Sequence, residues 1–386
     1  MGVRAKIIEL FNRKLKVVGK ENIKTNGSDN LYPERIERVI NNSVTAKSAS
    51  EKLHSFLLGE GFKVGNEEIL NTVKNLTKYD ILDMVCKDAS KQKGAWIHVN
   101  YDFEGNPNYY DVIPYKKIRR SETDDLGYGG LLYYSDDWGS EEDSSFSFGS
   151  DKQKTKKYFY PYNSKVSVIN EQRKRDIEGK EFLTEQKRLE ALVKNYRGQL
   201  FFVNLEPNTI YPLSFVDVVY NDADTEYRIG LFKNNKIRTG FVEATIIAVR
   251  EDEEIGDEDI KTLLGAENSS NVLKIVPESL DNSTKLEDAF HIETVSSNID
   301  KDLFVNWEET IKHNIRSSFC EIPKILVESS DGSFFGANSE AMDKAHDFYN
   351  NNTLKHRKTI VNQLSIVFNK PDLEIIPLKN GKSDVL

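Results

Sequence analysis

Two long helical patterns on either side of an acidic insert constrain the fold of this 386-residue chain more than any other feature. The first pattern runs from Pro212 to Gly240, and the second runs from Ile299 to Cys320. Proline suits the first turn of a helix, where its missing N–H has no partner to lose, and glycine commonly follows the last turn. At about 1.5 Å per residue, the first helix would be roughly 40 Å long. This order predicts a mechanical element rather than a ligand pocket.

The insert between the two helices has the pattern of a small β-α-β unit. We expect a strand over residues 241–249, a short acidic helix over 251–264 and a second strand over 271–276. A Gly/Ser-rich turn over residues 329–338 then leads into a third helix, from Asn338 to Phe368. The C-terminal half therefore reads as helix, insert, helix, loop and helix.

The N-terminal half predicts a mixed α+β domain. One helix begins at Pro33 and reaches Leu57, with a possible break over residues 41–43, and a second helix spans Glu67 to Lys91. Alternating apolar residues predict a half-buried antiparallel sheet. The strands of this sheet are expected at 96–103, 109–114 and 131–135, and further strands at 158–170 and 199–203, with a charged helix inside 173–196 and an exposed polar insertion at about 136–157.

Composition excludes several classes of protein. A net charge of −9 argues against a tight non-specific binder of nucleic acid, because neutralising phosphates requires clustered Lys and Arg. Two cysteines, Cys86 and Cys320, give neither a disulfide framework nor a zinc site, which fits a reducing interior. The first 18 residues read as a basic amphipathic arm, and no apolar stretch approaches the roughly 18 residues of a membrane span.

No catalytic, cofactor-binding or metal-binding residue is expected. The six histidines have no metal-ligand spacing, and the chain lacks both a Gly-x-Ser-x-Gly elbow and a Gly-Lys-Ser/Thr phosphate loop. An acidic run in the insert has three interpretations: a solvated helix face, an electrostatic docking surface, or a divalent-metal cluster without the ligand spacing of a calcium loop. That run comprises Glu251, Asp252, Glu253, Glu254, Asp257 and Glu258.

The turn over residues 329–338 also has three interpretations: an ordinary connector, a nucleotide loop, or a loop that contacts a passing polymer. A nucleotide loop is the weakest of them, because the motif that grips phosphate and magnesium is missing. Exposed aromatic residues favour the polymer contact. Its candidate residues are Ser333, Phe334, Phe335 and Asn338.

Five short segments, taken in order, resemble the portal proteins of tailed bacteriophages. They are Asp29-Asn-Leu-Tyr-Pro, Tyr133-Tyr-Ser-Asp-Asp-Trp-Gly, Asn235-Lys-Ile-Arg-Thr-Gly-Phe, Glu321-Ile-Pro-Lys-Ile-Leu and Gly336-Ala-Asn-Ser-Glu. No single segment is as specific as a catalytic signature, so the resemblance rests on their order from about Asp29 to Phe368.

The resemblance implies a phage-portal-like α+β fold with a known division of labour. In that division, 1–30 is a basic arm and linker, 31–211 the wing, 212–240 the first stem helix, 241–296 the clip, 297–325 the second stem helix, 326–338 the tunnel loop, and 339–386 the long helix with a reduced crown.

The same resemblance implies a non-enzymatic virion protein. Such subunits form a homo-oligomeric, typically dodecameric ring at a capsid vertex, assembled in the cytoplasm of the bacterial host, and double-stranded DNA is packaged and ejected through the ring. Expected partners are terminase, the head-tail adaptor, and the major capsid or scaffolding protein, with no cofactor and no membrane. The alternatives are another phage structural adaptor and, with weaker support, a metal-dependent nuclease or packaging motor component.

Overall fold

The computed structural model describes residues 17–18, 22–122, 130–138, 157–238, 244–248, 271–275, 301–328 and 339–379. The chain divides into two compact units. Unit 1 consists of Met1–Tyr220 together with Ile315–Leu386, and unit 2 consists of Asn221–Asn314. Each unit is described separately.

Eight strands of unit 1 form one sheet in the order β4-β3-β6-β5-β10-β9-β8-β7. They are β3 (Ile69–Asn71), β4 (Leu76–Thr77), β5 (Gly94–Tyr101), β6 (Pro107–Ile113), β7 (Ile118–Arg120), β8 (Leu132–Tyr134), β9 (Lys157–Pro161) and β10 (Gln199–Asn204). A separate short pair joins β1 (Val17–Val18) to β2 (Ile23–Lys24).

The sheet is mixed: the antiparallel pairing expected for the strands at 96–103 and 109–114 is confirmed by β5 and β6, but the sheet also contains a parallel pair. Strands β9 and β10 run parallel, with Gln199 opposite Tyr160, whereas β10 runs antiparallel to β5. A parallel pair requires a crossover connection, and the chain between β9 and β10 contains two helices that supply it.

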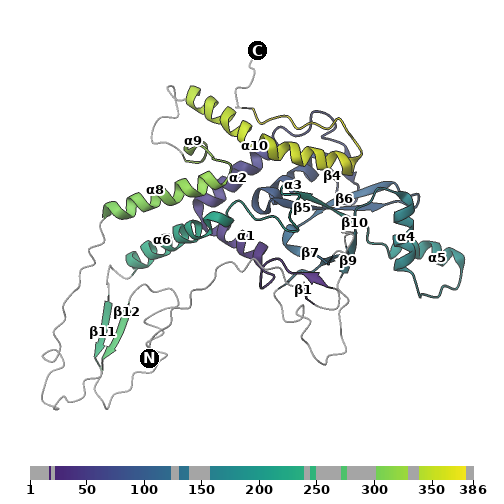
Figure 1. Ribbon diagram of the computed structural model, residues 1–386, viewed down its shortest axis with the longest axis horizontal. Helices are drawn as coiled ribbons and strands as arrows, with labels where there is room; N and C mark the ends of the chain where they lie inside the picture. Colours follow the sequence, from purple (N-terminus) through teal and green to yellow (C-terminus); the bar gives the residue numbers. More distant parts are fainter. Residues whose placement is uncertain are drawn as a thin grey trace. The chain divides into compact units, whose positions relative to one another are not determined.

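The helices of unit 1 lie on the sheet and on one another. Helix α3 contacts β5, β6 and β10, and helix α10 contacts α2 and β10 (Figure 1). These helices are α1 (Tyr32–Asn42), α2 (Val44–Leu58), α3 (Lys78–Gln92), α4 (Val166–Asp176), α5 (Glu185–Lys194), α9 (Lys324–Val327) and α10 (Ser339–Phe368), with 3-10 turns η1 (Tyr115–Lys117) and η2 (Asp217–Val219).

The break predicted near residue 42 is confirmed. Ser43 has extended backbone angles, and its hydroxyl accepts a hydrogen bond from the Ala46 N–H at 3.0 Å, so it caps a new helix. Helix α2 then ends at Gly59, whose φ of +59° is a conformation that glycine tolerates best.

The helix expected over residues 67–91 is wrong in its first half, because β3 and β4 form a hairpin there and α3 begins only at Lys78. Asn75 makes the turn with φ +53°, a conformation that asparagine adopts more readily than most residues. Thr77 and Asp80 then form a capping box that fixes the start of α3. Local hydrogen bonding therefore overrides the apolar spacing of the hairpin segment.

One further expectation needs correction: the strand expected over 158–170 ends at Pro161, because α4 begins at Val166. The charged helix expected inside 173–196 is confirmed as α5, and Gly179, at φ +75°, lies between it and the end of α4.

Helix α6 (Tyr220–Arg238) begins later than the helix predicted from Pro212. The backbone before it is held by side chains of unit 1 instead: the Ser214 N–H donates to the Tyr32 hydroxyl at 3.0 Å. With 19 residues, α6 is about 28 Å long rather than roughly 40 Å. The predicted end at Gly240 lies outside the described residues.

Unit 2 contains most of α6, the first part of α8 (Lys301–Ser318), and the strands β11 (Ala244–Ala248) and β12 (Asn271–Ile275). The two strands are parallel, with Ala244 opposite Asn271. Both fall inside the ranges predicted for the insert, and α8 confirms the second long helix. The acidic helix predicted over 251–264 lies outside the described residues.

The core of unit 1 lies around the central strands. One cluster packs Trp96 of β5 against Ile118, Leu132, Phe159 and Leu200 of neighbouring strands. Helix α10 confirms the predicted third helix, and after it Ile375 forms an antiparallel bridge with Phe62.

Candidate functional site

Neither sequence-predicted site falls on residues that the structure describes. The loop candidates Ser333, Phe334, Phe335 and Asn338, and the acidic candidates Glu251, Asp252, Glu253, Glu254, Asp257 and Glu258, lie in the gaps at 329–338 and 249–270. What the structure does describe is how the segments around those candidates are anchored.

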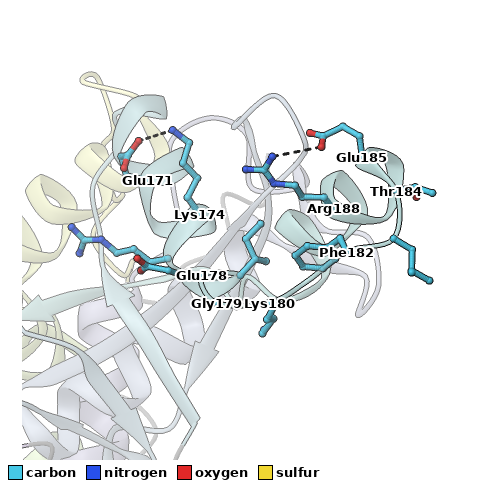
Figure 2. A pocket seen from close by; sticks show the side chains of 12 residues that line it. Glu171, Lys174, Glu178, Gly179, Lys180, Phe182, Thr184, Glu185 and Arg188 are labelled. Atoms are coloured by element: carbon cyan, nitrogen blue, oxygen red, sulfur yellow. Dashed lines mark hydrogen bonds and ion pairs between the residues drawn. The ribbon is translucent and has the colours of Figure 1, made fainter.

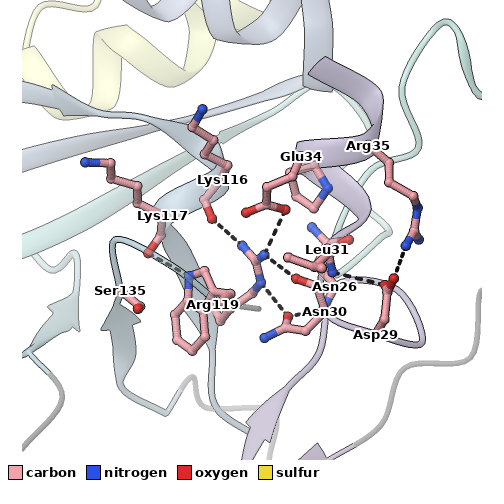
Figure 3. Close-up of polar contacts among 12 residues, drawn as sticks. Asn26, Asp29, Asn30, Leu31, Glu34, Arg35, Lys116, Lys117, Arg119 and Ser135 are labelled. Carbon is pink, nitrogen blue, oxygen red and sulfur yellow. Dashed lines mark hydrogen bonds and ion pairs between the residues drawn. The ribbon is translucent and has the colours of Figure 1, made fainter. Parts of the chain in front are cut away.

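A fully buried arginine joins two of the segments that carry the family resemblance (Figure 3). Arg119, on β7, is 0% exposed. Its Nε donates to Asn30 Oδ1 at 2.6 Å, and its Nη2 donates to the Asn30 carbonyl at 2.7 Å. On another side, the guanidinium lies 5.2 Å from the ring centre of Trp138. The segments beginning at Asp29 and Tyr133 therefore meet at one side chain.

The same guanidinium faces a carboxylate and a pair of carbonyls. Nη1 donates to the carbonyls of Lys116 at 2.7 Å and Ile118 at 3.0 Å, and Nη2 lies 3.5 Å from Glu34 Oε2 (Figure 3). Burial lowers the pKa of Arg119 and raises the pKa of Glu34, and in each case the charge of the other residue opposes the shift. A buried ion pair of this kind specifies geometry more than it adds stability.

The turn that supplies Asn30 is itself built by side chains. Asn30 has φ +63°, and its Oδ1 also accepts from the Asn26 N–H at 2.9 Å. Asp29 accepts from the Leu31 N–H at 3.1 Å and pairs with Arg35. The motif beginning at Asp29 is thus a structural turn that leads into α1.

The chain enters unit 2 from an anchored position. The Tyr32 hydroxyl donates to Asp217 at 3.1 Å. Nearby, the Tyr211 hydroxyl donates to the Lys24 carbonyl at 2.9 Å and accepts from the Arg120 N–H at 2.7 Å. These contacts fix the segment just before α6 to the body of unit 1.

The chain returns from unit 2 at a second anchored position. The Tyr349 hydroxyl of α10 donates to the Phe319 carbonyl at 2.9 Å, and Asn352 Nδ2 donates to the Cys320 carbonyl at 3.1 Å. Cys320 and Glu321 have φ values of +61° and +58°, so two successive non-glycine residues are held in the left-handed region. A conformation of this kind persists only where its surroundings enforce it.

The entry and the exit of unit 2 also touch each other inside unit 1. The rings of Phe215 and Phe319 stack with centroids 5.9 Å apart, and the buried Arg316 of α8 pairs with Glu328. The segment beginning at Glu321, the fourth segment of the resemblance, is therefore part of the same anchor.

Within unit 2, α6 and α8 are joined by polar contacts. Asn314 Nδ2 donates to Asp222 Oδ2 at 3.0 Å, and Lys233 pairs with Glu308. A shallow hollow of about 150 Å³ lies between the helices beside Gly230, where an added Cβ would meet no atom within 4 Å. Gly230 is therefore not required for close packing within this chain, and Trp307 on α8 is 52% exposed.

A larger open hollow of about 790 Å³ lies along α4 and α5 (Figure 2). Two ion pairs lie in its lining: Lys174 with Glu171 at 2.8 Å, and Arg188 with Glu185 at 3.5 Å. Helix α4 is fixed to the sheet below it, because Gln172 Oε1 accepts from both the Tyr196 hydroxyl and Gln199 Nε2 at 2.8 Å. Nothing in this hollow pairs a nucleophile with a base.

The titrating groups of unit 1 do not converge on a reaction centre. Burial raises the pKa of Cys320 to about 11 and lowers the pKa of His356 to about 4, so a neutral thiol and a neutral imidazole result at pH 7. Across the described ranges, no three His, Cys, Asp or Glu side chains gather as metal ligands, and no helix is long and apolar enough to cross a bilayer.

Sequence reasoning missed the anchoring residues Arg119, Tyr32 and Tyr349. Arg119 stands in a basic run, which normally indicates an exposed face. Tyr32 belongs to the motif beginning at Asp29. The sequence resemblance singled out this motif but did not indicate that Tyr32 anchors the segment before α6. Nothing in the local sequence of Tyr349 separates it from the other apolar positions of α10.

Comparison with known proteins gives only distant structural likeness. No protein-family model matches the sequence, and no curated protein matches it. One chain of the structure described as "Virion of native gene transfer agent (GTA) particle" is 9% identical, covering 89% of this chain and 83% of that chain, with a TM-score of 0.49. A chain from the neck of the native particle is 9% identical, covering 91% and 86%, with a TM-score of 0.45. These values assign the chain to no family.

Proposed function

We propose that this chain is the subunit of a ring-shaped portal, through which double-stranded DNA enters and leaves a phage capsid. One observation carries the proposal: unit 2 is a helix-strand-strand-helix insertion whose entry and exit are both anchored in unit 1, and α10 follows it. The five segments of the sequence resemblance occur in the same order along the chain.

The anchors suit a subunit that bears load. A motor that drives DNA through a ring pushes against the ring. The segments that connect the stem helices to unit 1 therefore need to be rigid. Tyr32 hydrogen-bonds the segment before α6, and Tyr349 hydrogen-bonds the segment after α8. Buried tyrosine hydroxyls with satisfied partners hold backbone in one geometry.

The open faces of unit 2 support assembly with copies of the same chain. Trp307 is 52% exposed and Phe232 is 38% exposed, and the hollow beside Gly230 has space for a neighbouring side chain. In a closed ring each subunit supplies cover for the next, since one heterologous contact repeats around the axis.

The remaining parts of the proposal follow from the family resemblance. The subunit is non-enzymatic, and an acidic conduit suits passage of DNA because a wall that bound phosphates tightly would slow it. Residues 241–296 would form the clip that receives terminase and then the head-tail adaptor, with the acidic run at 251–258 as its docking surface. The loop at 326–338 would contact DNA through Ser333, Phe334, Phe335 and Asn338.

The first test is the assembly state of the purified full-length chain. Mass photometry and negative-stain imaging over a range of salt and protein concentrations should show closed rings with a central channel. A strictly monomeric protein under all of these conditions would overturn the proposal. Rings without a channel wide enough for duplex DNA would favour a structural adaptor instead.

The second test separates DNA contact from assembly. Replacing both Phe334 and Phe335 by Ala should leave rings intact and impair DNA packaging or retention. Normal packaging by intact rings of this variant would remove the loop from the DNA path. Hydrolysis of ATP or DNA by the wild-type protein with magnesium or manganese would favour the motor or nuclease alternative.

A further inference from the structure

A small basic groove lies on unit 1, between the end of α1, the outer face of α2 and the last turns of α3. On α2, the lining positions recur at helical spacing, which places them on one face of the helix. On α3, the lining positions are likewise separated by three or four residues. The groove is lined by Ile40, Asn41, Lys47, Ser50, Glu51, His54, Lys87, Ser90 and Lys91.

The floor of the groove is made of two buried hydroxyls. Ser50 is 2% exposed and Ser90 is 1% exposed, and their Oγ atoms lie 3.4 Å apart. Ser90 donates its proton to the Lys87 carbonyl at 2.9 Å, so Ser50 is the donor of the pair. The Ser50 hydroxyl can rotate to donate to a ligand oxygen instead, because its proton has no other fixed partner in the groove.

The lining of the groove carries more positive than negative side chains. Of Lys47, Lys87 and Lys91, none forms an ion pair with any residue that the structure describes. Lys87 and Lys91 are four residues apart on α3, where like charges repel. Glu51 is the single carboxylate among the lining residues.

The neighbouring acidic groups are hydrogen-bonded within the protein. Asp88 feels the charges of both α3 lysines, but its Oδ2 accepts from the Tyr115 N–H at 2.8 Å on another element. Asp83 is hydrogen-bonded at 2.9 Å to Nε2 of His54, which itself lines the groove. An incoming anion would therefore find the lysine ammonium groups available, in a chain whose net charge is −9.

We propose that this groove binds a phosphate group. Lysine is a common phosphate ligand, acting as a compact point charge, and the Ser50 hydroxyl adds a directed donor. The hollow has a volume of about 70 Å³. One water molecule needs about 10–15 Å³ by the same measure, so the hollow has room for a tetrahedral oxyanion. The phosphate is either free in solution or part of a DNA backbone passing over the surface.

The test uses the full-length protein with two probes, inorganic phosphate and a short DNA duplex. Isothermal titration at constant ionic strength measures phosphate binding, and fluorescence anisotropy over a salt series measures DNA binding. The double variant Lys87→Gln/Lys91→Gln should weaken binding by at least about tenfold, for whichever of inorganic phosphate and the DNA duplex the wild-type protein binds. If DNA is bound, the slope of log affinity against log salt should also fall by about 2, roughly 1 for each lost contact.

A matched control separates the groove from general surface charge. Lys355→Gln/Lys358→Gln removes the same charge from α10, outside the groove, and should leave binding unchanged. Lys47→Gln, on the other helix, and Ser50→Ala, which keeps every charge, provide second variants if the α3 pair impairs folding.

The two sources of phosphate give different results. Phosphate binding that depends on the groove while DNA binding does not identifies a site for the free ion. If the groove variants weaken DNA binding, the groove contacts the phosphate backbone of DNA. Equal effects of the groove and control variants, or no binding of either probe, would overturn the proposal. Ring assembly is measured separately, so failure here is distinguishable from failure of the portal proposal.

Discussion

Removing Arg119 should destabilise unit 1 by an amount that depends on pH. The variant Arg119→Met keeps most of the side-chain volume but leaves the partly buried Glu34 without its cation. Removing one partner of a fully buried pair costs about 3–5 kcal/mol, and the 32% exposure of the Glu34 side chain places the expected cost at the lower end. The carboxyl group can escape part of this cost by taking up a proton. From its ordinary pKa of 4.5, protonation at pH 7 costs about 3.4 kcal/mol, at 1.36 kcal/mol for each pH unit.

The sign of the pH dependence follows from proton binding. Burial raises the pKa of Glu34 already in the wild type, and the charge of Arg119 opposes this shift. Removing Arg119 therefore raises the pKa further, so folded Glu34 binds a proton that the unfolded chain has lost above pH 4.5, and the stability of the variant falls as pH rises. The loss relative to wild type should be about 3 kcal/mol at pH 7 and smaller at pH 5, where protonation of Glu34 costs less. The second variant Arg119→Met/Glu34→Gln should recover much of the loss at pH 7.

Urea unfolding monitored by tryptophan fluorescence is a suitable assay, because the Trp138 ring lies 5.2 Å from the guanidinium. The control Lys174→Met breaks a pair whose side chains are 64% and 62% exposed, and should change stability by less than about 0.5 kcal/mol. A loss below about 1 kcal/mol for Arg119→Met, equal at pH 5 and pH 7, would show that Glu34 is solvated and would refute the reasoning.

Two further predictions concern unit 1. Burial raises the pKa of Asp88 to about 7, although the hydrogen bond from the Tyr115 N–H opposes the shift. Wild-type stability should therefore fall by roughly 2–4 kcal/mol between about pH 4 and pH 7. Urea titrations at each pH should show a flatter slope for Asp88→Asn, and an unchanged slope would assign the pH dependence to other groups. Gly59→Ala should lower the free energy of unfolding by more than about 2 kcal/mol, because φ is +59° and the new Cβ would lie 2.0 Å from the Ile376 carbonyl oxygen. Gly179→Ala, at φ +75° in open space, should lower it by about 1 kcal/mol. Equal melting temperatures for the two variants would contradict the steric argument.

The long helices were predictable because their signals are strong and local. The boundaries expected for α10, Asn338 and Phe368, agree with the structure to one residue, and α8 lies inside the predicted range. In both helices, apolar residues recur at helical spacing over many turns, so an error at any one position does not change the prediction.

The errors arose where side chains bond to nearby backbone. Residues 67–77 have apolar residues at helical spacing, yet Ile69 is 54% exposed and Val73 is 82% exposed on a hairpin. Asn71 explains the difference, since its Oδ1 accepts from the N–H groups of Val73 and Lys74 and stabilises the turn. Periodicity alone does not contain this information.

The anchors could not be predicted, because each depends on partners far away in the sequence. Arg119 bonds Asn30, which lies 89 residues earlier, and Tyr32 bonds Asp217, which lies 185 residues later. The candidate contact residues at 251–258 and 333–338 remain predictions from sequence, since they lie outside the described residues.

The contact between the entry and the exit of unit 2 has an evolutionary consequence. Phe215 and Phe319 stack on each other within unit 1, so the two ends of the insertion leave from neighbouring points on a scaffold that makes its own core and sheet. Insertions at such sites leave the host domain's folding largely intact. Residues 221–314 can therefore diverge, or be exchanged as a cassette, while the scaffold stays constant. A lineage could change this insertion without having to rebuild the rest of the chain.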